Sequence, residues 1–207
     1  MVLRMNPEAA LINVVLLWML TTPHEFAHAW VATKLGDDTP RREGRVTLNP
    51  LAHVDWIGTV LLPAVTSLVG AGFLGWGRPV NTNPSKLRGG LNGMALVALA
   101  GPGSNVIFAV ALAAIAALAA GASANVANFA ARGARLSIYL ALFNMIPVPP
   151  LDGSKLLLAA RIPVEVYAMV ARYGFLLLIL LIAYTDVGIT ISAWSVEATR
   201  AMLGWFS

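Results

Sequence analysis

The sequence predicts an all-α polytopic membrane protein with five to six membrane helices, a re-entrant segment and a short β element near the cytoplasmic face. Two observations lead to this fold class. Of the 207 residues, 58% are hydrophobic and only 12% are charged, whereas a soluble domain is about half apolar and about a quarter charged. Several apolar stretches are also long enough to cross a bilayer, which takes about 20 residues of helix. We expect one domain over residues 1–207, with a core at about 8–160 and C-terminal helices at 164–206.

The first apolar stretch, residues 8–35, is predicted to be a transmembrane helix, and Gly36 suits its end. A polar connector follows over residues 36–55. Within it, residues 45–49 alternate between polar and apolar, which predicts a short strand. The next apolar stretch, residues 57–74, is barely long enough to span a bilayer and contains glycines and a proline. We expect it to re-enter the membrane rather than to cross it as a straight helix.

The rest of the chain holds four further apolar stretches. Residues 91–120 predict a transmembrane helix that is interrupted by Gly-Pro-Gly at 101–103. Residues 128–146 predict another, which ends at a run of prolines, and residues 164–184 predict a third. The tail at 187–206 fits either a further span or a helix that lies in the membrane interface.

The charged residues lie mostly at the ends of the apolar stretches, as membrane topology requires. Basic residues flank the 57–74 stretch on both sides, so the positive-inside rule places both of its ends on the cytoplasmic side. The next two helices then run out and back, which returns Asp152 to the side where the first helix ends. Arg132 and Arg135 would lie outside, against the rule. The formal charge of +4 is not gathered on a polar face, so we expect the lipid bilayer and not a nucleic acid as a partner.

The HExxH pattern at residues 24–28 predicts a metal site. His24 and His28 lie one helical turn apart on one face, so both imidazoles can reach one ion. Glu25 is rotated by roughly 100° from His24, because a helical turn takes 3.6 residues, and this position suits a base that acts on water. Ionisable residues inside an apolar span are costly and functional by default. The chain has no cysteine, so thiolate chemistry and disulfides are excluded, and we expect one Zn²⁺ per chain.

A catalytic zinc site needs a third protein ligand and an open position, and Asp152 is the candidate for the ligand. Pro147, Pro149 and Pro150 end a helix and favour extended geometry, which makes the segment before Asp152 stiff. Irregular backbone at membrane depth is tolerated only against protein or a water-filled cavity. Taken alone, Asp152 fits equally well as the N-cap of a short helix that begins near Ser154. Because the two histidines otherwise lack a third protein ligand for the metal, we favour the interpretation of Asp152 as that ligand.

Three sequence runs together resemble the site-2 protease family of intramembrane zinc metalloproteases. They are HEFAH at 24–28, AGPGSN at 100–105 and NMIPVPPLDG at 144–153. The resemblance covers about the first 160 residues, and GWGRPV at 75–80 is similar to the small prokaryotic members. It implies an endopeptidase in a prokaryotic cell membrane, with its active site toward the cytoplasmic side. The substrates would be membrane proteins, cut in or near a transmembrane helix.

The resemblance also implies roles for single residues. The zinc ligands that it implies are His24, His28 and Asp152. Glu25 would be the catalytic base, and Asn144 and Asn105 would contact the substrate or the oxyanion. Independently of the resemblance, we hypothesise that an extended stretch at 78–80, paired with residues 46–48, offers an edge to which an unwound substrate adds as a strand.

Alternatives remain at one residue and for the function as a whole. His53 is either an auxiliary polar group near the site or a connector residue at the membrane interface, and the second interpretation is favoured. The sequence predicts no particular substrate, trigger or oligomeric state. A membrane zinc-binding protein or transporter without protease activity would also place His and Asp in its spans. A transporter needs a second polar pathway, however, and the stretches at 91–120 and 164–184 offer almost no ionisable residues.

Overall fold

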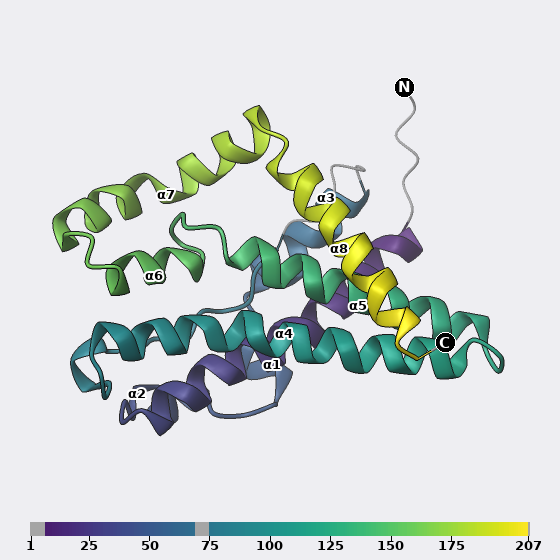
Figure 1. The fold of residues 1–207 in the computed structure, drawn as a ribbon, viewed down its shortest axis with the longest axis horizontal. Coiled ribbons are helices and arrows are strands. Elements are labelled where there is room, and N and C mark those ends of the chain that lie inside the picture. The colour runs from purple at the N-terminus through teal and green to yellow at the C-terminus, as the bar shows by residue number, and fades with distance from the viewer. Residues whose placement is uncertain (1–6, 69–74, 207) are drawn as a thin grey trace.

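The computed structural model describes residues 7–68 and 75–206, and all regular structure in these two ranges is helical (Figure 1). The long helices are α1 (Pro7–Lys34), α4 (Leu91–Ala119), α5 (Ala124–Asn144), α7 (Val164–Tyr184) and α8 (Val187–Gly204). The short elements are α2 (Thr39–Arg42), α3 (Leu62–Leu68), α6 (Gly153–Ala159), the 3-10 turns η1 (Pro50–His53) and η3 (Pro84–Lys86), and the π-helical turn η2 (Trp56–Leu61).

Helices α1, α4 and α5 lie side by side and form the core of the molecule (Figure 1). The start of α4 packs against the end of α1, where Val97 and Ala32 belong to one buried cluster. Further along α4, Asn105 reaches back to His24 of α1, so the two helices are antiparallel. Helix α5 returns along α4 and therefore runs in the direction of α1 (Figure 1). This order brings the end of α5, and the loop to α6 that carries Asp152, back toward the half of α1 that holds the histidines.

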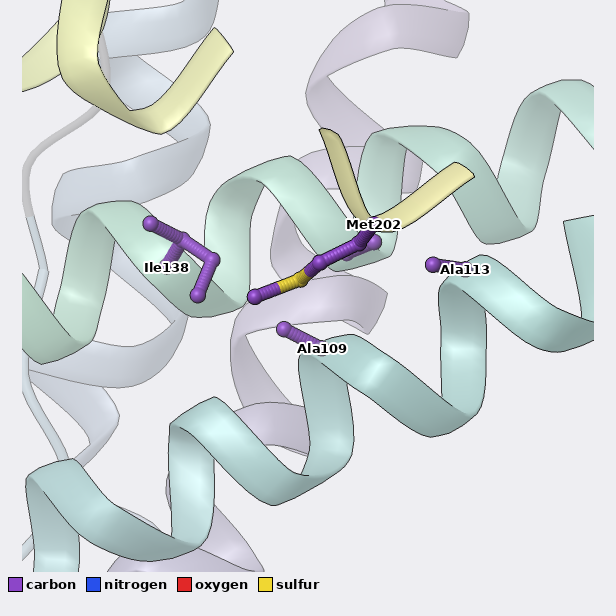
Figure 2. Packing of buried hydrophobic residues seen from close by; sticks show 5 residues of the cluster. Ala109, Ala113, Ile138 and Met202 are labelled. Carbon is purple, nitrogen blue, oxygen red and sulfur yellow. The ribbon is translucent and has the colours of Figure 1, made fainter. Parts of the chain in front are cut away.

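Helix α8 closes the core at the opposite end (Figure 1). Met202 of α8 inserts between Ala109 and Ala113 of α4 and Ile138 of α5 (Figure 2). Alanines one turn apart let neighbouring backbones approach closely, which is how helices pack in membranes. The small residues of α4 therefore allow three helices to meet around one methionine.

Three of the described helices are long and apolar enough to cross a membrane, namely Ala10–Lys34, Leu91–Ala119 and Val164–Tyr184. They lie within the predicted stretches 8–35, 91–120 and 164–184, which confirms that helices of sufficient length and apolarity form there. The interruption expected at 101–103 is wrong, since α4 continues through Pro102 without a break. Helices α5 and α8 form where helices were expected, but the arginines of α5 and the charged residues of α8 make them less apolar.

The predicted strand at residues 45–49 is wrong, since no strand occurs anywhere in 7–68 or 75–206. A strand needs a neighbour that completes its ladder of hydrogen bonds, and side chains hold this loop instead. The ring Nε2 of His53 donates to the carbonyl of Thr47 at 2.9 Å. The guanidinium of Arg45 donates to the carbonyl of Ala52. The connector therefore folds back on itself rather than extending.

The stretch predicted to re-enter, residues 57–74, begins as a helix. The π-helical turn η2 leads directly into α3, and the apolar helical part covers only Trp56–Thr66. This length is too short to cross a bilayer, which takes about 20 helical residues. The second half of the stretch, residues 69–74, lies outside the described residues.

The buried Asp37 joins the end of α1 to the segment that leads into α4. Its carboxylate accepts hydrogen bonds from the backbone N–H of Thr39 at 3.0 Å and of Asn83 at 2.6 Å. Burial raises the pKa of Asp37, but these hydrogen bonds lower it more, so the pKa lies below its ordinary value. Asp37 therefore stays ionised at neutral pH and fixes α1 against the chain entering α4.

Candidate metal centre

Two histidines on one side of α1 converge on a single point. His24 and His28 lie four residues apart, and their Nε2 atoms are 3.0 Å from each other. Both side chains are buried, with 5% and 4% of the residue surface exposed. The helical spacing of the motif brings the two rings together, as positions i and i+4 of a helix do.

Asp152 reaches these histidines from the loop between α5 and α6. Its Oδ2 lies 3.1 Å from Nε2 of His24 and 3.0 Å from Nε2 of His28. Asp152 occupies the N-cap position of α6, yet its side chain makes no capping hydrogen bond. Its placement depends on close packing, because a Cβ added at Gly153 would lie 2.2 Å from the carbonyl oxygen of Met145. The carboxylate therefore faces the histidines, and the N-cap interpretation does not describe it.

These three residues are the group among the described side chains that could hold a metal ion. Their donor atoms form a triangle with sides of 3.0 to 3.1 Å. Three donors bound to one tetrahedral zinc at about 2.0–2.2 Å lie on the order of 3.3 Å apart. Two imidazoles and one carboxylate also form a donor set that leaves zinc an open position. The geometry and the chemistry of the group thus fit this ion.

Helix α4 leaves room for an ion next to the two rings. A Cβ added at Gly101 would lie 2.3 Å from Nε2 of His28 and 2.6 Å from Nε2 of His24. Zinc binds a histidine nitrogen at about 2.0–2.1 Å, so the missing side chain vacates the region that an ion bound to both rings would use. Any larger residue at position 101 would fill that space.

The second ring nitrogen of His28 is held by the backbone of α4. Nδ1 of His28 lies 2.6 Å from the carbonyl oxygen of Val97. A carbonyl can only accept, so Nδ1 carries the proton and Nε2 of the neutral ring keeps its lone pair. Metal-bound histidines commonly donate their other N–H in this way. The contact therefore fixes the orientation of the His28 ring and leaves its Nε2 able to bind a metal.

Asn105 of α4 lies against the second ring nitrogen of His24. Its Nδ2 is 3.2 Å from Nδ1 of His24, the residue is fully buried, and its Oδ1 has no partner among the described atoms. The opposite amide orientation would bring Oδ1 against Nδ1 and place the ring proton there. Nε2 of His24 would then be free to bind a metal, so the orphaned amide oxygen also fits a metal at this position.

Replacing Asn105 with alanine is expected to weaken zinc binding by about 10- to 100-fold, because His24 loses the group that orients it. Competition with a chelating dye measures the affinity. Asn92→Ala serves as the matched control, since Asn92 is an exposed asparagine of the same helix. Unchanged zinc affinity together with slower cleavage would instead favour the contact with substrate that the resemblance implies.

Glu25 is buried beside the three donors but is not one of them. A Cβ added at Gly77 would lie 3.4 Å from Oε1 of Glu25 and 3.2 Å from Cβ of Thr21. The backbone around residue 77 thus passes directly over the carboxylate. Glu25 is therefore enclosed between α1 and this segment, close to the point where the histidines meet.

The segment at 75–80 makes backbone hydrogen bonds to other residues than the predicted strand at 46–48. The N–H of Arg78 donates to the carbonyl of His53 at 2.9 Å, and the N–H of Trp76 donates to the carbonyl of Gly58 at 3.0 Å. The expected pairing with residues 46–48 does not occur among these hydrogen bonds. The segment still lies beside Glu25 at Gly77.

The two remaining residues singled out from the sequence are not among the three donors. Asn144 is half-buried at the end of α5, and its Nδ2 donates to the carbonyl of Leu140 at 2.9 Å. His53 is fully buried in the connector. Burial lowers the pKa of His53 below its ordinary value, although its hydrogen bond to Thr47 opposes this. A neutral ring bound within its own loop fits the connector interpretation.

Sequence reasoning missed the residues that surround the donors. The Val97 carbonyl and the space at Gly101 reach the histidines only because of how α4 packs on α1. No sequence motif predicts such a contact. Lys155 could have been found, because it lies three residues after Asp152 at the start of a helix. Residues three apart on a helix are neighbours, and Nζ of Lys155 lies 2.8 Å from Oδ1 of Asp152.

Comparisons with known proteins agree with this geometry. The sequence model described as peptidase family M50 matches residues 114–181, a range that contains Asp152. The protein named "Putative zinc metalloprotease YwhC" from Bacillus subtilis (strain 168) is 37% identical over 179 residues, which cover 81% of this chain and 78% of that protein. The one named "Putative zinc metalloprotease Rip2" from Mycolicibacterium smegmatis is 30% identical over 163 residues, which cover 77% of this chain and 61% of that protein. No solved structure matches the chain.

The likeness to YwhC extends over most of both chains, and the family model matches residues 114–181. The buried group of two histidines and one aspartate supplies the donor set that such an enzyme needs. The chain therefore belongs to peptidase family M50, the site-2 protease family of zinc metalloproteases.

Proposed function

We propose that the protein is an intramembrane zinc endopeptidase that hydrolyses peptide bonds in or near the transmembrane segments of membrane proteins. The observation that carries this proposal is the convergence of His24, His28 and Asp152, whose donor atoms lie within 3.1 Å of one another. The two histidines belong to a helix apolar enough to span a membrane. A buried, charged group at such a place is costly unless it is used.

In this proposal the three residues hold one zinc ion per chain, and Glu25 is the base. A bound zinc ion supplies Lewis acidity, which polarises the scissile carbonyl and makes water a better nucleophile. Glu25 takes a proton from the attacking water as the new C–O bond forms. It then delivers this proton to the amide nitrogen as the C–N bond breaks, so that one water is consumed and a carboxyl and an amine are released. The enclosure of Glu25 keeps bulk water away from this transfer.

The proposal also assigns the protein to the membrane as a single domain over residues 1–207. Besides the three apolar helices, α5 and α8 would lie at membrane depth, which gives five membrane helices, and residues 57–74 would re-enter as a sixth membrane segment. The end of α1 and the loop with Asp152 would face the cytoplasm, since basic residues cluster in the adjoining connector. In this orientation the site lies near one face of a prokaryotic cell membrane, within reach of water.

The substrate would be a membrane protein whose transmembrane helix unwinds locally, because a helix hides its peptide bonds in internal hydrogen bonds. The segment at 75–80, which passes beside Glu25, would bind the unwound chain along its backbone. Asn144 would contact the substrate from the end of α5.

Removal of the metal tests the proposal. We expect purified protein in lipid nanodiscs to contain one zinc per chain and to cut a labelled transmembrane helix. Treatment with 1,10-phenanthroline should reduce cleavage to the level of an enzyme-free control, and added zinc should restore it. Cleavage that persists in zinc-free protein would refute the proposal. So would zinc flux across sealed liposomes without cleavage, which is the behaviour of a transporter.

A further inference from the structure

The two oxygens of the Asp152 carboxylate have different partners. Oδ2 faces the histidines, at 3.1 Å from His24 and 3.0 Å from His28. Oδ1 turns the other way and accepts a hydrogen bond from Nζ of Lys155 at 2.8 Å. A carboxylate between two such partners cannot rotate without losing one of them.

Lys155 is placed for this contact by the start of α6. It lies three residues after Asp152, so one turn of helix brings its side chain back over the carboxylate. The side chain of Lys155 is 28% exposed and that of Asp152 is 8% exposed. Solvent therefore weakens this ion pair less than it weakens a pair on the surface. The hydroxyl of Ser154 donates to the carbonyl of Leu151 at 2.7 Å and fixes the same turn. The ammonium group of Lys155 is thus held against Oδ1 of Asp152.

We propose that Lys155 is a positioning residue that restricts Asp152 to a single metal-binding oxygen, an inference that rests on the function proposed above. Zinc accepts carboxylates through one oxygen or through both. A catalytic site has three protein ligands and keeps its fourth position open. If Oδ1 were free, it would swing toward the ion and compete for that position. The charge-assisted hydrogen bond from Lys155 holds Oδ1 away from the ion.

The proposal is tested with Lys155→Met, which keeps the length of the side chain and removes its charge. Lys155→Arg restores a cation that can donate to Oδ1. Lys86→Met is the matched control, because Nζ of Lys86 pairs with Oδ1 of Asp38 at 2.9 Å in an ion pair outside the metal centre. If the methionine variant does not fold, Lys155→Gln, which is shorter and polar, is measured in its place.

Four quantities are measured for each variant: the affinity for zinc, the visible spectrum of the Co²⁺-loaded protein, kcat and KM. We expect Lys155→Met to bind one metal per chain. Its Co²⁺ absorption should lose intensity, because a second carboxylate oxygen raises the coordination number above four. We expect kcat to fall about 10- to 100-fold and KM to change little. Lys155→Arg should recover the spectrum and most of kcat, and Lys86→Met should match the wild type throughout.

Two outcomes would overturn the inference. One is a wild-type Co²⁺ spectrum in Lys155→Met, whatever its kcat, since the carboxylate would then bind in the same way without its partner. The other is a wild-type kcat in that variant. If the wild-type protein itself bound no metal at this centre, the proposed function would fail first. The metal content of the wild type therefore tells the two failures apart.

Discussion

Replacing Glu25 with glutamine is expected to abolish peptide hydrolysis while zinc stays bound. Glutamine has nearly the same shape as glutamate but cannot take a proton from water. Loss of a general base typically costs about 10²- to 10⁴-fold in rate. Glu25 is not one of the three grouped donors, so the affinity for zinc should change little. Cleavage of a labelled transmembrane helix and the zinc content of the same sample measure both effects.

The control for this variant is Glu43→Gln. Glu43 is an exposed carboxylate of the connector that accepts hydrogen bonds from Nδ2 of Asn81. Its loss removes the same charge at a distance from the donors, and cleavage should continue at the wild-type rate. A Glu25→Gln protein that kept more than a tenth of the wild-type kcat would show that another group moves the proton.

Replacing Gly101 with alanine is expected to remove zinc binding and, with it, hydrolysis. The added Cβ would lie 2.3 Å from Nε2 of His28 and 2.6 Å from Nε2 of His24, closer than unbonded atoms approach. It would occupy the region in which an ion bound to both rings must sit. Glycine to alanine in the interior of a helix stabilises it by roughly 0.5–1 kcal/mol. A loss of zinc binding would therefore not result from a lower stability of helix α4.

Gly103 offers the matched control for this substitution. It lies in the same helix two residues later, and a Cβ added there meets nothing within 4 Å. Gly103→Ala should bind one zinc per chain and cleave as the wild type does. Elemental analysis after dialysis measures the zinc in both variants. One tightly held zinc in Gly101→Ala would contradict the placement of the ion between α1 and α4.

The helices were largely predictable because each depends on local composition. The predicted stretch at 164–184 coincides with α7, and the one at 8–35 differs from α1 by one residue at each end. The grouping of Asp152 with the histidines was predicted less directly, because only the spacing of His24 and His28 is a property of one helix. Asp152 lies 128 residues from His24 in the sequence. It was favoured because the two histidines need a third ligand and because of the resemblance to the site-2 protease family.

The rest of the site could not be predicted, because it depends on contacts between distant segments. The carbonyl of Val97 and the space at Gly101 exist only once α4 packs against α1. The strand expected at 45–49 is absent because the connector lacks a neighbouring strand and its side chains bind the loop instead. Alternation of polar and apolar residues marks a chain suited to a strand, but the partner decides whether a strand forms.

We expect one metal ion to be held jointly by α1 and by the loop before α6. Anomalous diffraction at the zinc absorption edge, from crystals of the zinc-loaded protein, tests this most directly. We predict a single peak at about 2.0–2.2 Å from Nε2 of His24, Nε2 of His28 and Oδ2 of Asp152. A peak bound by other residues, or one that leaves Asp152 out of its ligands, would contradict the account.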